Sequence, residues 1–286
     1  MRRVALIIAV AALATPAPSQ TKPQLVAIRH GDVPLYDVYA WERWGNFINA
    51  QAGSKTEIPY DAARLQVKVY PFPSGEIRAI RFNNAVRTHR HINLTDTILY
   101  SWQAHRVQFV NKLAVVAGPG DFALHQKGVD HSGEEIRRGG GIDLEFALPF
   151  TGMHNDPTGR WSFAAANPIQ PAATWIRDGK PIEAIGAEAA AAPAGAIPYQ
   201  VRVAKLAGYT ARELYLPAGA RLPIRDDARD RLFFVLKGRV VFTTAGKDQP
   251  MEVEDAGWLA SGTVGTLTAG EDAMLAEAMV PPAKAR

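Results

Sequence analysis

The chain has 286 residues, of which 47% are hydrophobic and 21% charged, and its formal net charge is +4. This composition is ordinary for a globular protein, and so small a positive excess does not indicate a nucleic-acid or anionic-membrane partner. The absence of cysteine excludes disulfides and thiolate ligands, so any metal ion must be held by nitrogen and oxygen.

Residues 1–20 have the layout of a cleaved secretory signal peptide. Arg2 and Arg3 precede an apolar run over residues 4–14, and small residues and proline follow over 12–20. The run is too short for a membrane-spanning helix, and no other segment reaches the roughly 18 apolar residues that a span needs. We therefore expect a periplasmic or secreted mature protein with no membrane partner and a net charge of about +2.

Residues 21–64 form an N-terminal extension with mixed signals. Over residues 36–50, apolar side chains recur near helical spacing, as the segment YDVYAWERWGNFINA shows. This spacing predicts one short helix in the extension.

Two later blocks have the texture of β-structure. Residues 65–150 carry short alternating runs such as RLQVKVYPF, TILYSW and HRVQFV, and residues 199–281 carry RLFFVLKG and RVVFTTAG. Period-two runs at short spacing predict an all-β barrel or sandwich, and two such blocks roughly 130 residues apart suggest a duplication. Residues 151–198 are looser, and their alanine-rich run is interrupted by Pro193 and Gly195, so a linker or a helix is compatible with it.

The first block contains a pair of histidines, His89 and His91, two positions apart. Residues with this spacing project from the same face of a strand, so both imidazoles could bind one ion. On its own, an H-x-H pair more often consists of exposed or core histidines than of metal ligands. A third histidine, His131, follows about forty residues later.

With these residues the sequence resembles the cupin superfamily, whose first motif is G-x5-H-x-H-x3/4-E-x6-G. His89 and His91 stand at the histidine positions, while Asn83 replaces the leading glycine and Ala104 the closing one. The resemblance implies two cupin β-barrels (double-stranded β-helices) in tandem over residues 65–150 and 199–281.

The second cupin motif, G-x5-P-x-G-x2-H-x3-N, follows at a suitable distance. Gly120, Gly128 and His131 fall at its spacing, whereas Gln126 replaces its proline and Glu135 its asparagine. The resemblance implies that His89, His91 and His131 hold one divalent ion, which could be Fe, Mn, Ni, Cu or Zn.

The family's fourth ligand, a glutamate, is missing. Counting forward from His91 reaches Asp96, whose carboxylate could bind the ion, whereas counting back from Ala104 reaches Thr97. We favour three histidines with Asp96 as an additional ligand, and the alternative is a three-histidine site with Thr97 at the fourth position and Asp96 in a turn.

In the second block, Arg225, Asp227, Arg231 and Gly265 stand at the four ligand positions. Two arginines would repel a cation, so this barrel is predicted to have lost its metal and to have a structural role. An anion site that includes Arg225 and Arg231 is the sharper alternative.

Two further residues of the first block are candidates for catalysis. His125 precedes the second-motif turn and points either into the barrel as an acid or base or outward as a bystander. Tyr100, with Trp102, either lines the pocket or belongs to the core.

The resemblance supports two functions from different classes. The first is a metal-dependent enzyme that acts on a small oxygen-bearing molecule, either as a dioxygenase that cleaves phenolic or diketone-like compounds or as a lyase or isomerase. The alternative is a non-catalytic binding protein for a carbohydrate or small acid, with a structural metal. The resemblance also implies dimerisation through sheet edges.

Overall fold

The structure is a computed structural model that describes residues 25–37, 65–82, 86–87, 91–92, 95–110, 113–127, 129–136, 140–148, 161–164, 174–177, 180–182, 197–206, 209–224 and 228–282. Over these residues it is built of β-strands, and their one helical segment is the 3-10 helix η1 (His30–Asp32). Within the same ranges no helix is long and apolar enough to cross a membrane.

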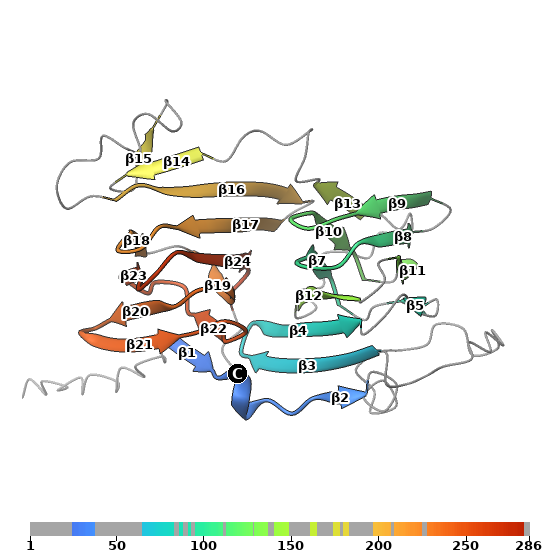
Figure 1. Ribbon diagram of the computed structural model, residues 1–286, viewed down its shortest axis with the longest axis horizontal. Helices are drawn as coiled ribbons and strands as arrows, with labels where there is room; N and C mark the ends of the chain where they lie inside the picture. The colour runs from blue at the N-terminus through green and yellow to red at the C-terminus, as the bar shows by residue number, and fades with distance from the viewer. Residues whose placement is uncertain are drawn as a thin grey trace, which may run out of the picture.

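The strands form two barrels, each made of one large and one small antiparallel sheet (Figure 1). In the first barrel the large sheet has seven strands in the order β13-β10-β7-β12-β4-β3-β2, and the small sheet contains β5, β11, β8 and β9, with β6 also pairing to β11. The bounds are β2 (Tyr36–Asp37), β3 (Leu65–Phe72), β4 (Gly75–Phe82), β5 (Val86–Arg87), β6 (His91–Ile92), β7 (Thr97–Ser101), β8 (Arg106–Val110), β9 (Leu113–Ala117), β10 (Phe122–His125), β11 (Asp130–Glu135), β12 (Gly141–Ala147) and β13 (Trp161–Ala164).

The second barrel repeats this plan with an eight-stranded sheet, ordered β1-β22-β19-β24-β17-β16-β14-β15, and a four-stranded sheet, ordered β18-β23-β20-β21. Its strands are β1 (Leu25–Ile28), β14 (Thr174–Arg177), β15 (Lys180–Ile182), β16 (Tyr199–Leu206), β17 (Tyr209–Leu216), β18 (Arg221–Ile224), β19 (Asp230–Lys237), β20 (Val240–Thr244), β21 (Lys247–Met251), β22 (Ala256–Leu259), β23 (Gly265–Ala269) and β24 (Ala273–Val280). The two-barrel, all-β fold that the sequence predicts is therefore confirmed.

The two large sheets pack against each other through an apolar layer that joins the barrels. Because side chains alternate along a strand, every second residue of β7 and β12 points into this layer. Ile98 and Leu144 from the first barrel share one buried cluster with Phe234 of the second. Tyr70 of β3 meets Phe234 edge-on, with ring centroids 5.7 Å apart. Burial of this area is the main force that holds the two barrels together.

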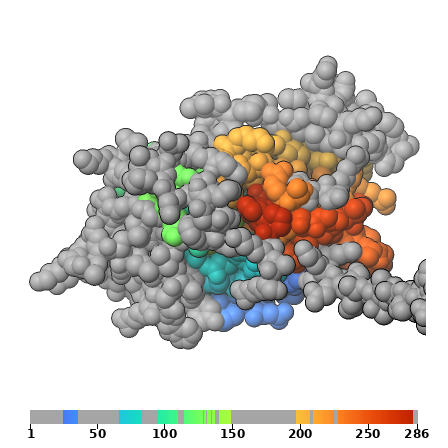
Figure 2. All heavy atoms as spheres, turned by 180° about the vertical axis from the view of Figure 1, so that it is seen from behind, coloured from blue at the N-terminus to red at the C-terminus, as the bar shows by residue number. Residues whose placement is uncertain are grey.

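The N-terminal segment connects both barrels. β1 pairs with β22 of the second barrel, and a few residues later β2 pairs with β3 of the first. Seen from behind, residues of this segment (blue) lie next to β3 and β4 (teal) (Figure 2).

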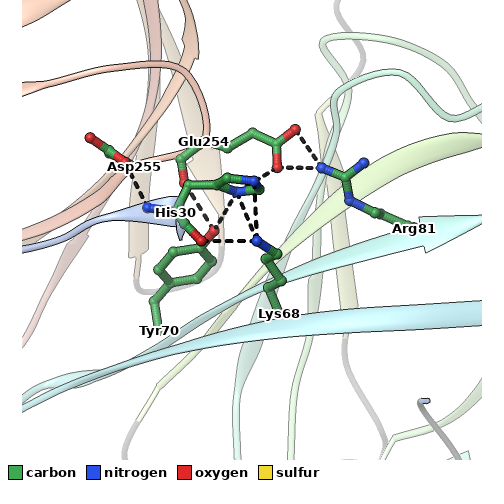
Figure 3. Close-up of polar contacts among 6 residues, drawn as sticks. All are labelled: His30, Lys68, Tyr70, Arg81, Glu254 and Asp255. Atoms are coloured by element: carbon green, nitrogen blue, oxygen red, sulfur yellow. Dashed lines mark hydrogen bonds and ion pairs between the residues drawn. The ribbon is translucent and has the colours of Figure 1, made fainter. Parts of the chain in front are cut away.

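A polar network fixes this segment to the seam between the barrels (Figure 3). His30 Nδ1 lies 2.8 Å from a carboxylate oxygen of Glu254, and its backbone N–H donates to Asp255 at 2.7 Å. Arg81 of β4 also contacts Glu254, while Lys68 of β3 donates to the carbonyl of His30 at 2.9 Å. Side chains from both barrels thus enclose His30.

The predicted helix over residues 36–50 is wrong at its start. Tyr36 and Asp37 form β2, because the edge of β3 offers backbone hydrogen-bond partners that a helical turn would give up. Residues 38–50 lie outside the described part. Three strands occur in the stretch between the barrels, where β13 pairs with β10 and the hairpin β14–β15 extends the larger sheet of the second barrel.

Candidate active site

The interior of the first barrel is lined by polar side chains. On β7, Thr97 and Ser101 lie on the face opposite to Ile98, so they point away from the second barrel and into the first. Asp143 and Glu145 of β12 share this inner face, since Asp143 pairs with Ser101 in the ladder. The second barrel differs because a large apolar cluster fills its interior. Buried polar groups are costly, so a polar barrel interior indicates a functional site.

Two histidines meet inside the first barrel. His125 ends β10 in the large sheet, His131 lies on β11 in the small sheet, and their ring centroids are 4.1 Å apart. Both are almost completely buried. Of the two orientations left open for His125, the structure shows the inward one.

The tautomer of His131 follows from its hydrogen bond. Nδ1 lies 2.9 Å from the carbonyl oxygen of Val129, and a carbonyl can only accept, so Nδ1 carries the proton. The lone pair is then on Nε2, which is the usual ligating atom when the other nitrogen is held by a carbonyl.

His91 is the direct cross-strand partner of His131 in the β6–β11 ladder. Directly opposed positions of an antiparallel pair lie on one face, about 5 Å apart at Cβ. Residue 91 is described by its backbone alone, and His89 lies outside the described residues. Within the described part, no three His, Asp or Glu side chains are grouped as a metal site, so the three-histidine set stays a prediction.

Both carboxylate oxygens of Asp96 accept hydrogen bonds. One carboxylate oxygen accepts the backbone N–H of Lys127 at 2.8 Å, and the other accepts the hydroxyl of Tyr209, from the second barrel, at 2.6 Å. Thr97, in contrast, is the direct partner of His125 on the inner face. Thr97 therefore faces the barrel interior, whereas Asp96 contacts the turn that follows β10 and the facing barrel.

Tyr100, a candidate for catalysis, lies outside the first barrel's interior. Its position on β7 has the opposite parity to Thr97, so the ring points between the barrels and packs on Phe122 with centroids 4.6 Å apart. Its hydroxyl donates to Glu213 of β17 at 2.6 Å. Burial and the nearby Glu213 carboxylate raise the pKa of Tyr100 well above 10. Tyr100 therefore joins the two barrels.

Two buried ion pairs line the inner face beside the histidines. Arg106 Nη1 donates to Asp143 Oδ2 at 2.6 Å, and Arg78 Nη1 donates to Glu145 Oε2 at 3.3 Å. Burial raises the pKa of both carboxyl groups, and the neighbouring arginines act in the opposite direction. Arg78 also donates to Glu76 at 2.6 Å.

Two further donors in this interior have no acceptor in the part of the chain that the structure describes. Gln108 Nε2 and Arg106 Nε are buried, and neither has a hydrogen-bond partner among the described residues. Buried donors are normally satisfied, so these atoms fit a ligand or water with oxygen acceptors. The sequence signal for this set is the alternation in HRVQFV and IDLEFA, where polar residues occupy every second position.

Among the described residues of the second barrel, this arrangement is absent. Gly265 stands at the position that corresponds to His131. It pairs with Ile224, just as His131 pairs with His91 in the first barrel. A Cβ at Gly265 would lie 2.3 Å from the carbonyl oxygen of Thr243, so the site has no room for a histidine. Arg231 lies 3.6 Å from Glu277, and Arg225 and Asp227 lie outside the described residues.

No protein-family model and no curated protein matches the chain. Solved structures do match it over most of its length. HEPD from Streptomyces albus, with 2-hydroxyethylphosphonate and Fe(II) bound, has a TM-score of 0.59 at 10% identity and covers 93% of this chain and 78% of its own. The chain has the cupin fold.

Two other structures support the fold. Salicylate 1,2-dioxygenase from Pseudoaminobacter salicylatoxidans, as a variant in complex with gentisate, has a TM-score of 0.54 at 13% identity and covers 92% of this chain and 84% of its own. The bacterial pirin of Escherichia coli in complex with nickel(II) has a TM-score of 0.52 at 13% identity and covers 87% and 99%. At these identities the likeness concerns the fold alone.

Proposed function

We propose that the first barrel is a metal-dependent enzyme site that acts on a small oxygen-bearing organic molecule. The observation that carries the proposal is the polar interior around His125 and His131, in a fold whose second copy has an apolar interior. Similar folds that bind Fe(II) with 2-hydroxyethylphosphonate, gentisate or Ni(II) support it.

The residues present suit one divalent ion. His131 presents Nε2, and His91 is its direct partner in the ladder. The inner face of the barrel carries four carboxylates, Glu76, Glu135, Asp143 and Glu145, against two guanidinium groups, so its charge favours a cation. His89, His91 and His131 would hold the ion, which can be Fe, Mn, Ni, Cu or Zn.

When bound, such an ion supplies Lewis-acid chemistry and, for redox-active metals, oxygen chemistry at open coordination positions. The protein's own residues can then bind and orient the substrate. Gln108 and Arg106 present buried donors to its oxygen atoms. His125, whose imidazole lies against His131, is placed to hold or transfer a proton inside the barrel.

Two parts of the proposal rest on the sequence alone. The leader-like residues 1–20 favour export to the periplasm or beyond. The reaction class is narrowed only to oxygenative cleavage or to lyase or isomerase chemistry, because the fold hosts both and the inner face contains groups that suit both.

The test distinguishes an open site from a structural metal. We expect the mature chain loaded with Mn(II) to increase the relaxation rate of water protons. The increase should be clearly larger than in a matched His131→Ala sample, because a catalytic ion keeps exchangeable water. A tightly bound ion without any enhancement would indicate a closed ligand set and a binding protein with a structural metal, and would overturn the enzyme proposal.

A further inference from the structure

The two barrels share one buried ion pair at equivalent positions. In the first barrel Arg78 and Glu145 are direct partners across β4 and β12, and in the second Arg212 and Glu277 are direct partners across β17 and β24. Both pairs are in contact through their side chains. The equivalence is independent of sequence alignment, because it follows from ladder register.

Two neighbours of this pair differ in charge between the barrels. Glu76 lies two positions before Arg78 on the same face of β4, and Thr210 lies two positions before Arg212 on β17. The two are equivalent because Glu76 pairs with Ala147 of β12 and Thr210 pairs with Met279 of β24, two positions after the glutamate in each case. Thr97, the partner of His125, corresponds to Arg231, the partner of Leu259. An acid is thus replaced by a hydroxyl and a hydroxyl by a guanidinium, which makes the second site more positive by two charges.

Other cations gather at the same end of the second barrel. Arg229 Nη1 donates to the Thr210 hydroxyl at 3.2 Å, and Lys205 Nζ approaches the same oxygen at 3.5 Å. Arg231 Nη1 lies 3.6 Å from Glu277, which also contacts Arg212. Among the described residues of this cluster, four cationic groups therefore surround one hydroxyl and one carboxylate.

The cluster is largely built into the fold. Thr210 and Arg231 are 8% exposed and Glu277 is fully buried, Arg212 and Arg229 are half-buried, and Lys205 is exposed, so the charges lie partly out of water. In such surroundings the attraction for an anion is stronger than at an exposed surface. Arginine also presents donors in a planar fork that matches carboxylate and phosphate oxygens.

We propose that the second barrel binds a small oxyanion, a carboxylate or phosphate group, at the cluster formed by Thr210, Arg212, Arg229, Arg231 and Glu277, with Lys205 at its edge. The site occupies the end of the barrel where the first barrel has Thr97 and Glu76. The second barrel has therefore exchanged the residues of a cation site for those of an anion site.

Isothermal titration calorimetry of the full mature chain in 150 mM NaCl tests this, with inorganic phosphate in one series and malonate in another. We expect saturable binding of at least one of them, and the stronger series identifies the anion class. The variants Arg231→Thr and Thr210→Glu each replace a residue of the second barrel by its counterpart in the first. Each should weaken anion binding roughly tenfold or more.

Arg221→Thr is the matched control, because it removes an exposed arginine of β18 and leaves the cluster intact; its affinity should equal that of the wild type. The two test variants lie on different strands, so failure of one to fold leaves the other decisive. The proposal is overturned if the wild type shows no saturable binding of either anion, or if a folded Arg231→Thr or Thr210→Glu variant binds as tightly as the control.

Discussion

Asp143 and Glu145 show what burial does to single residues inside the first barrel. Each has an arginine partner, yet desolvation is the larger effect and raises the pKa of both carboxyl groups. A raised pKa in the folded state means that folding takes up protons. The stability contributed by each group is therefore fully present below its ordinary pKa, 3.8 for Asp143 and 4.5 for Glu145, and is lost as the pH rises through the folded value.

This gives a pH prediction for metal-free protein. Between pH 4 and 8 the free energy of unfolding should fall less for Asp143→Asn than for the wild type. The difference between the two decreases should be roughly 1.4 kcal/mol for each unit by which the pKa of Asp143 is raised. Asn does not titrate, so the contribution of Asp143 to the pH dependence, including its pairing with Arg106, is absent from the variant. Urea unfolding across the pH range measures both curves, and parallel curves would contradict the raised pKa of Asp143.

Tyr100 provides a second prediction at this scale. Tyr100→Phe removes a buried hydrogen bond to the Glu213 carboxylate, so the free energy of unfolding should fall by about 1–2 kcal/mol while metal content stays unchanged. Tyr215→Phe is the control, since its 3.3 Å bond to Asp272 is exposed and should contribute little. If Tyr100→Phe lost bound metal while its stability was unchanged, Tyr100 would belong to the active site and not to the contact between the barrels.

Single residues differ in how well the sequence predicts them. Spacing placed position 91 on β6 and His131 on β11, where the ladder makes them partners. Spacing could not separate Asp96 from Thr97, because one position of register decides which faces inward, and the hydrogen bond from Tyr209 to Asp96 comes from a residue 113 positions away. Long-range contacts of this kind carry no local sequence signal.

At the scale of elements, period-two alternation predicts two kinds of strand well: small-sheet strands with one exposed side, such as β20, and strands such as β12, where polar inner-face residues alternate with apolar residues of the layer between the barrels. The first segment of the chain is different. Tyr36 and Asp37 lie in a strand, although the apolar spacing there is helical, since pairing with β3 overrides local preference.

Strand β23 has no room for a side chain at position 265, where a third histidine ligand would stand in the second barrel. Gly265 is packed so closely against Thr243 that Gly265→Ala should lower the free energy of unfolding by roughly 1–3 kcal/mol. Gly270→Ala is the control, because its nearest atoms belong to the flexible side chain of Arg239 at 3.3 Å and its cost should be below about 0.5 kcal/mol. Chemical denaturation measures both, and equal stabilities would show that position 265 can accept a side chain.

At the scale of the whole molecule, the two barrels share a fold and a buried Arg–Glu pair but differ in what fills them. The first has histidines, carboxylates and arginines beside apolar groups such as Phe82 and Leu99 on its inner face, whereas the second has an apolar cluster and a basic end. The apolar layer between the large sheets and the N-terminal strands then hold the two barrels together.

We propose that the protein binds one metal ion in the first barrel and none in the second. Elemental mass spectrometry of purified mature protein, before and after chelation and reloading, tests it most directly. We predict about one equivalent of Fe, Mn, Ni, Cu or Zn in the wild type and in Arg231→Thr, and almost none in His131→Ala or in His89→Ala combined with His91→Ala. Stoichiometric metal in the histidine variants, or no metal in the reloaded wild type, would contradict the account.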